Sequence, residues 1–169
     1  MIPGCEIKLL ITDFDGTLVD TFRANYMAYR KAFEEVGLVL CETDYRCCFG
    51  YRFEKFMEVC GVTDEKKAAE IKELKSFYYP DYFKYLQVND VLLRLLLTFK
   101  KGGGKIAVAS TARRKNLDNV LRYIGVVDNF DYILAGEDVE CGKPSPEIYE
   151  KVLSYFGMLP SEALIFEDS

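Results

Sequence analysis

Two aspartates follow a run of apolar residues near the start of the chain. The run 9–11 leads through Thr12 to Asp13, and Asp15 stands two positions later, directly before Gly16. In an extended chain, residues two apart point the same way, so both carboxylates can face one site. Carboxylates held together repel each other unless a cation lies between them, and Mg²⁺ prefers oxygen ligands of this kind. The pattern indicates a magnesium site, although aspartates in this spacing are also common in acidic turns.

Further polar residues come later, where strands or turns are expected to end. They are Ser110, Thr111, Lys143, Glu167 and Asp168. Alone, each has a plainer explanation, because a hydroxyl after a strand is ordinarily a helix cap and a single lysine is ordinarily solvated. Ligands of open parallel sheets, however, bind beyond the carboxyl ends of the strands. The shared placement of these residues therefore predicts one common site.

The segment Asp13-Phe14-Asp15-Gly16-Thr17 resembles the first motif of the haloacid dehalogenase superfamily of phosphatases and phosphomutases. The later polar residues match the other motifs of that superfamily in type and in order. The resemblance implies that Asp13 is a nucleophile that becomes phosphorylated and that Asp15 is the general acid and base.

The same resemblance assigns roles to the later residues. Ser110 and Thr111 match the motif that binds the transferring phosphoryl group. Lys143 matches the lysine that balances the charge of nucleophile and phosphate, a role suited to developing phosphoryl charge. The resemblance also implies a Mg²⁺ cofactor whose ligands come from four acidic residues: Asp13, Asp15, Glu167 and Asp168.

The elements expected to position these residues alternate between strands and helices. Apolar runs predict buried strands over residues 7–13, 105–109, 132–135 and 163–166. Helical patterns between the later runs imply parallel pairing through crossover connections. The predicted fold is α/β, with a Rossmann-like parallel sheet.

A helical insertion is expected after the first strand. Apolar residues spaced by four and three predict a helix from Thr21 to Gly37, with its inward face made by Phe22, Tyr26, Tyr29, Phe33 and Val36. Residues 38–79 show helical patterns and no strand pattern. This matches the helical cap domain of the superfamily. We predict a core domain of residues 1–17 and 87–169 and a cap domain of residues 18–86.

Composition excludes several classes of function. The chain has 169 residues and a net charge of −5, from 27 acidic and 22 basic residues, which argues against a nucleic-acid partner. It has no histidine, which removes histidine-based triads and bases. No apolar run is long enough to span a bilayer, and no signal peptide is evident. The cysteines lack a metal-ligand spacing, so we expect reduced thiols in the cytoplasm.

Two features separate the branches of the superfamily. Asp15 points to phosphoryl transfer, because true dehalogenases lack the second aspartate. β-Phosphoglucomutase-like members carry a histidine where this chain has Asn25, and their G-x-x-R cap loop is one residue out of step with Gly50-Tyr51-Arg52. Arg52 is a candidate substrate contact from the cap, although a solvated arginine is the plainer alternative. We therefore expect a phosphatase acting on a small phosphorylated metabolite, with a phosphomutase as the alternative.

The chain stops soon after the fourth motif, at Ser169, whereas superfamily members usually continue with another strand and helix. Strand 163–166 would then be an exposed apolar edge, which favours self-association. Asp168 would lie close to a fraying terminus. A truncated, non-catalytic fragment of the same fold is therefore a further alternative.

Overall fold

The computed structural model describes residues 6–168; residues 1–5 and Ser169 lie outside the described part. The chain forms two compact units. The first comprises the described residues up to Asp20 together with those from Gln87 onward, and the second is Thr21–Leu86. The first boundary thus follows Asp20, whereas the sequence prediction placed it after Thr17.

The first unit is built on a parallel four-stranded sheet with strand order β5-β4-β1-β6. Its strands are β1 (Leu9–Thr12), β4 (Lys105–Ala109), β5 (Tyr132–Leu134) and β6 (Ala163–Phe166). All residues of β1 are buried, as are the last four of β4, because both strands lie inside the sheet and are covered on both faces. The predicted α/β fold with a parallel sheet is confirmed.

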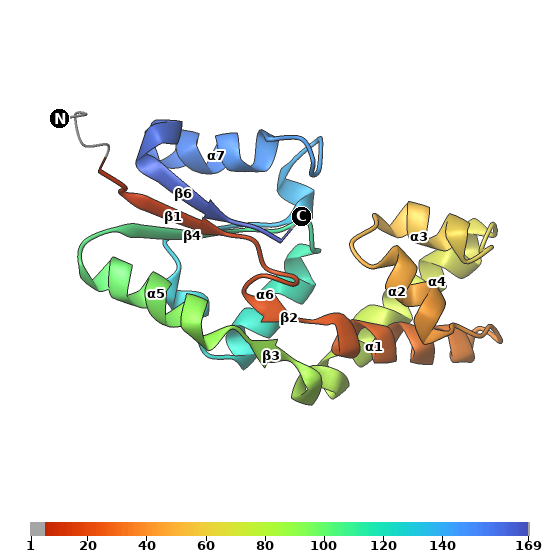
Figure 1. Ribbon diagram of the computed structural model, residues 1–169. Coiled ribbons are helices and arrows are strands. Elements are labelled where there is room, and N and C mark those ends of the chain that lie inside the picture. Colours follow the sequence, from red (N-terminus) through yellow and green to blue (C-terminus); the bar gives the residue numbers. More distant parts are fainter. Residues whose placement is uncertain (1–5, 169) are drawn as a thin grey trace. The chain divides into compact units, whose positions relative to one another are not determined.

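Helices cover both faces of this sheet (Figure 1). Helix α7 (Glu147–Phe156) lies on one face, where Ile148 and Val152 join a buried cluster with alternate residues of β1 and β4. Helices α5 (Asp90–Lys101) and α6 (Arg114–Tyr123) lie on the other face (Figure 1). The connections through these helices bring the carboxyl ends of the strands to one edge.

Helix α5 is longer than its sequence signals predict. In the sequence, Asn89 is a helix cap, the helix is predicted to run through Leu97, and residues 102–104 are predicted to form a flexible glycine exit. Asn89 does cap the start of the helix, because its side chain accepts a hydrogen bond from the backbone N–H of Leu92 at 3.1 Å. The helix continues to Lys101, however, and the backbone N–H of Gly102 still donates to the carbonyls of Thr98 and Phe99 at 3.1 Å. The glycines form a close turn, because a Cβ at Gly104 would overlap the Phe99 ring.

A second, two-stranded sheet was not predicted. Strand β2 (Val19–Asp20) pairs antiparallel with β3 (Gln87–Val88), and the backbone N–H of Asn89 donates to the Leu18 carbonyl at 2.9 Å. The sequence predicts hinges at about residues 16–20 and 79–88, and it gives no signal for this pairing. Strands of two residues are too short to show the alternation on which a strand prediction rests.

All regular elements of the second unit are helices. It contains α1 (Phe22–Glu35), α2 (Glu42–Cys48), α3 (Phe53–Val59), α4 (Glu65–Tyr78) and a 3₁₀ segment, η1 (Tyr79–Tyr85). The apolar stripe predicted on α1 packs on the core of this unit, but of its members only Phe33 is fully buried. The fully buried positions also include Ala24, Ala28 and Ala32, because α1 packs closely against both α4 and η1. Within residues 6–168, no helix has the length and apolar character needed to cross a membrane.

Candidate active site

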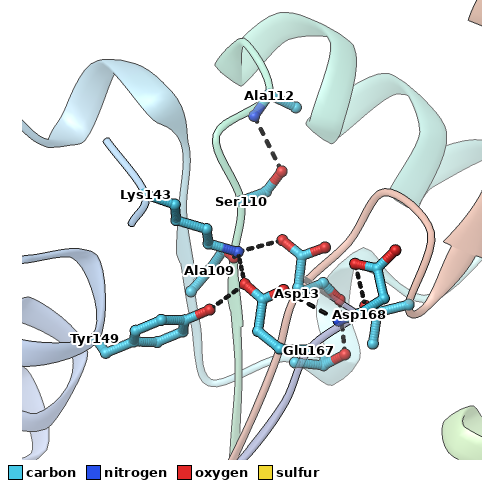
Figure 2. A network of polar contacts seen from close by, with 10 residues as sticks. Asp13, Ala109, Ser110, Ala112, Lys143, Tyr149, Glu167 and Asp168 are labelled. Carbon is cyan, nitrogen blue, oxygen red and sulfur yellow. Dashed lines mark hydrogen bonds and ion pairs between the residues drawn. The ribbon is translucent and has the colours of Figure 1, made fainter. Parts of the chain in front are cut away.

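Five of the polar residues singled out in the sequence meet at the carboxyl edge of the four-stranded sheet: Asp13, Ser110, Lys143, Glu167 and Asp168 (Figure 2). Asp13 directly follows β1, and its backbone N–H donates to the carbonyl of Phe166 in β6 at 2.9 Å. Ser110 directly follows β4, and its backbone N–H donates to the carbonyl of Leu134 in β5 at 3.0 Å. These bonds continue the ladders beyond the strands, so they fix the two residues at neighbouring strand ends.

Lys143 joins two carboxylates at this edge. Its ammonium forms ion pairs with Oδ1 of Asp13 and Oε1 of Glu167 and donates to the carbonyl of Ala109 at 3.2 Å (Figure 2). The side chains of Asp13, Lys143 and Glu167 are 9, 16 and 20% exposed. Ion pairs this deep are poorly screened by water, so their charges act strongly on one another.

Burial and the neighbouring positive charge shift the pKa of Asp13 in opposite directions. Burial raises the pKa of Asp13 to about 6, while the ammonium of Lys143 lowers it in part. The nearby carboxylates of Glu167 and Asp15 add to the rise in the pKa of Asp13. For Lys143, burial lowers the pKa, but Asp13 and Glu167 raise it well above its ordinary range. The lysine is therefore a permanent cation that partly offsets the penalty of ionising Asp13.

Three carboxylates lie close enough to share a cation. One oxygen from each of Asp13, Glu167 and Asp168 falls within 4.8 Å of the others, and the three residues are buried, half-buried and exposed in that order. Hard divalent cations such as Mg²⁺ take oxygen ligands and commonly keep open positions for a substrate phosphate. The donor set at this edge therefore fits the cofactor that the sequence indicated.

Asp15 lies in the turn that leaves β1. Its side chain is half-buried and is not one of the three clustered carboxylates. The next residue, Gly16, has a φ of +88°, and a Cβ there would overlap the carboxylate of Asp168. Thr17 donates a hydrogen bond from its hydroxyl to Oδ1 of Asp168 at 3.2 Å. The glycine thus allows the turn and makes room for Asp168 beside it.

Ser110 is buried and faces the same edge as Asp13 (Figure 2). Its Oγ accepts a hydrogen bond from the backbone N–H of Ala112 at 3.0 Å. The hydroxyl proton of Ser110 can therefore point away from that turn, toward a ligand. Thr111 is exposed, and its carbonyl lies so close to Gly136 that a Cβ there would overlap it.

Arg52 is the one predicted site residue that belongs to the second unit. It is exposed and immediately precedes α3. The residues that the structure brings together at the sheet edge are Asp13, Ser110, Lys143, Glu167 and Asp168.

The sequence reading missed two residues of α7. Tyr149 donates a hydrogen bond from its hydroxyl to Oε1 of Glu167, and the ammonium of Lys143 lies 5.3 Å from its ring centre. Glu147 accepts hydrogen bonds from the backbone N–H groups of Glu140 and Cys141, at 2.9 and 2.7 Å, and so closes the loop that carries Lys143. Neither has a sequence signal, because a tyrosine and a glutamate in the first turn of a helix are ordinary.

Comparison with known proteins extends these observations. Residues 10–169 match the family described as haloacid dehalogenase-like hydrolase. YhcW of Bacillus subtilis (strain 168), named as a candidate phosphatase, is 33% identical over 168 residues, which are 96% of this chain and 76% of that protein. The phosphorylated carbohydrates phosphatase of Thermotoga maritima is 31% identical over an alignment of 170 positions, which covers 96% of this chain and 77% of that protein.

Among solved structures, the β-phosphoglucomutase of Clostridium difficile superposes with a TM-score of 0.78 at 26% identity. The match covers 96% of this chain and 77% of that one. The family match over residues 10–169 extends over both compact units and includes every candidate residue.

Proposed function

Since this chain belongs to the haloacid dehalogenase-like hydrolases and is a phosphatase-type hydrolase, we propose that it hydrolyses a small phosphorylated metabolite through a phosphorylated Asp13. One observation carries the proposal. A buried carboxylate, Asp13, is paired with the half-buried cation Lys143 at the end of a central strand, and two more carboxylates lie within reach of a shared metal. A buried ion pair of this kind is weak evidence of a purely structural role, because it adds little net stability.

The proposed cofactor is Mg²⁺, held by the side chains of Asp13 and Asp168 and by the backbone carbonyl of Asp15, with Glu167 nearby. When bound, the cation neutralises the charge that otherwise keeps a phosphate dianion away from the Asp13 carboxylate.

The chain's own groups account for the two half-reactions. A carboxylate oxygen of Asp13 attacks phosphorus in line with the leaving oxygen, the P–O bond to the leaving group breaks, and Asp15 gives that oxygen its proton. Asp15, now ionised, takes a proton from a water whose oxygen attacks the phosphorus of phosphorylated Asp13. Inorganic phosphate leaves and Asp13 is restored. The hydroxyl of Ser110 and the ammonium of Lys143 hold the equatorial oxygens, and Thr111 is a further candidate for binding the phosphate.

The substrate class follows from relatives. The similarity to a phosphatase of phosphorylated carbohydrates supports a sugar phosphate or a similarly small ester. We place the reaction in the cytoplasm, where such metabolites occur and where thiols stay reduced; the described cysteines, Cys41, Cys47, Cys48, Cys60 and Cys141, are all free.

A phosphomutase is the second candidate, favoured by the likeness to β-phosphoglucomutase. A mutase would return the phosphoryl group to the sugar. With β-glucose 1-phosphate as substrate, accumulation of glucose 6-phosphate identifies a mutase, whereas stoichiometric release of inorganic phosphate identifies a phosphatase.

The decisive experiment measures phosphate release from p-nitrophenyl phosphate and from a panel of sugar phosphates, with Mg²⁺ and with EDTA. Turnover should require Mg²⁺ and should be lost in Asp13→Asn. The matched control is Asp128→Asn, an exposed aspartate of the first unit, which should keep full turnover. A folded protein that turns over none of these esters would contradict the proposal and favour an inactive member of the fold.

A further inference from the structure

A short 3₁₀ turn, η3 (Gly136–Asp138), contacts the residues that connect β4 to α6. These connecting residues, 110–113, are called the Ser110 loop below. The backbone N–H of Gly136 donates to the carbonyl of Ala112 at 2.8 Å. Gly136 also lies so close to Thr111 that a Cβ would overlap the Thr111 carbonyl. The turn and the loop therefore lie backbone against backbone, in an approach that requires glycine at position 136.

Glu137 binds the far end of the same loop. Its Oε2 accepts a hydrogen bond from the backbone N–H of Arg114, the first residue of α6, at 2.8 Å. The first N–H groups of a helix have no partner within it. The side chain of Arg113, which precedes the helix, offers only donors and cannot accept from them. Glu137 thus supplies an acceptor for the start of α6 from a different part of the chain.

Asp138 fixes the side chain of Arg114. Its carboxylate forms an ion pair with the Arg114 guanidinium and accepts the backbone N–H of Ala135 at 2.7 Å. The same guanidinium donates to the carbonyl of Ile133 in β5 at 3.0 Å. An isolated ion pair at this exposure would add little stability. Here the bonds form one network, which attaches the start of α6 to the end of β5.

The shape of the Ser110 loop depends on these contacts, because the loop has no regular secondary structure of its own. Ser110 is buried, and its Oγ accepts the backbone N–H of Ala112 at 3.0 Å (Figure 2). Ala112 is also the residue whose carbonyl accepts from Gly136. A displacement of η3 would therefore move Ala112 and, through it, the hydroxyl of Ser110.

We propose that η3 is a positioning element for the Ser110 loop, with Glu137 as its positioning residue. Glu137 acts through the loop, by holding the N–H of Arg114, and so sets where Ser110 presents its hydroxyl. This inference rests on the proposed function for its effect on turnover, but not for its effect on the order of the loop.

The kinetic test uses Glu137→Ala, which removes the acceptor, and Glu137→Gln, which keeps an amide oxygen in its place. The matched control is Glu150→Ala, at an exposed glutamate of α7 in the same unit. With p-nitrophenyl phosphate, kcat/KM of Glu137→Ala should fall about fivefold, which corresponds to about 1 kcal/mol and is the usual worth of a helix cap. Glu137→Gln should stay within about twofold of the wild-type value, and Glu150→Ala should match it. An unchanged kcat/KM in Glu137→Ala would overturn the positioning role.

A double-mutant cycle with Ser110→Ala shows whether Glu137 acts through the serine hydroxyl. When that hydroxyl is already absent, Glu137→Ala should cause little further loss of kcat/KM. A general weakening of the fold would instead reduce kcat/KM by the same factor in both backgrounds, and this result would overturn the proposal.

Hydrogen exchange supplies a readout that needs no turnover. In metal-free Glu137→Ala, the amides of Ala112 and Arg114 should exchange at least fivefold faster than in the wild-type protein, while those of β4 should be unchanged. Equal exchange in the two proteins, or the same acceleration in β4 as in the loop, would overturn the proposal. A failure of the phosphatase proposal is distinguishable, because it would leave every variant without turnover and the difference in exchange intact.

Discussion

Replacing Asp13 by asparagine should make the metal-free protein more stable while abolishing its activity. Burial raises the pKa of Asp13 from 3.8 to about 6, even with Lys143 beside it. A carboxyl group with a raised pKa in the folded state stabilises the fold below its unfolded pKa, and that contribution is lost as the pH rises through the folded pKa. At pH 8 the ionised carboxylate therefore opposes folding, and neutral asparagine does not.

The size of the effect follows from the shift. A rise of roughly two pKa units, at about 1.4 kcal/mol each, corresponds to about 3 kcal/mol at pH 8. This value is an upper limit for the gain in the free energy of unfolding, because asparagine also lacks the ion pair with Lys143. For a chain of this length, a difference of that size corresponds to a rise in Tm of at most about 6–12 °C.

The assay is thermal and urea unfolding in EDTA from pH 4 to pH 8, with Asp128→Asn as the control. The advantage of Asp13→Asn should be largest at pH 8, should shrink between pH 6 and pH 4, and should disappear near pH 4. Added Mg²⁺ should raise Tm of the wild-type protein and leave that of Asp13→Asn nearly unchanged. An Asp13→Asn variant that is no more stable than the wild-type protein at pH 8 would refute the reasoning.

Three further perturbations test other parts of the structure. Glu147→Gln removes the carboxylate that closes the Lys143 loop, so the variant should have a lower Tm than the wild-type protein. Hydrogen bonds from Lys151, Cys141 and Glu140 lower the pKa of Glu147 to about 2. The difference in Tm should therefore be present above pH 4.5 and should be lost as the pH falls toward 2. In Gly16→Ala, the new Cβ would sit at a φ of +88° and would overlap the carboxylate of Asp168, a proposed metal ligand. The affinity for Mg²⁺, measured by calorimetry, should therefore fall at least tenfold. An affinity equal to that of the wild-type protein would contradict the close approach of Asp168 to Gly16. Leu164→Lys places a charge on the edge strand β6, where Leu164 is 47% exposed. Light scattering should show less self-association of this variant than of the wild-type protein. Unchanged self-association would show that the β6 edge is not the surface through which the chains associate.

Much of the fold could be predicted because its strong signals are local. The runs that form β1 and β4 are apolar without interruption, since both faces of an inner parallel strand are covered. Asn89 and Gly157 mark a helix start and a helix end by their own chemistry. The ribbon of β2 and β3 was missed, because a pairing of two residues across 66 intervening positions leaves no periodic trace.

For the candidate site as well, some residues could be predicted from the sequence and others could not. Asp13, Ser110, Lys143 and Asp168 were found because each stands at a recognisable place in a motif. Their roles stay predictions until turnover and metal binding are measured. Tyr149 was missed because its importance lies in its contact with Glu167, a residue far along the chain, and helical spacing favours a core position for it. The alanines of α1 were missed because close helix packing selects small residues that an apolar stripe does not single out.

The bridge that Lys143 forms between Asp13 and Glu167 has an effect on the order of events at this edge. Together with Asp168, three carboxyl groups face one ammonium there, so acidic groups outnumber basic ones at this edge. A phosphate dianion approaching this surplus is repelled, and a divalent cation arriving beforehand cancels it. For the proposed reaction, this imbalance of charge predicts that the metal binds before the phosphate ester.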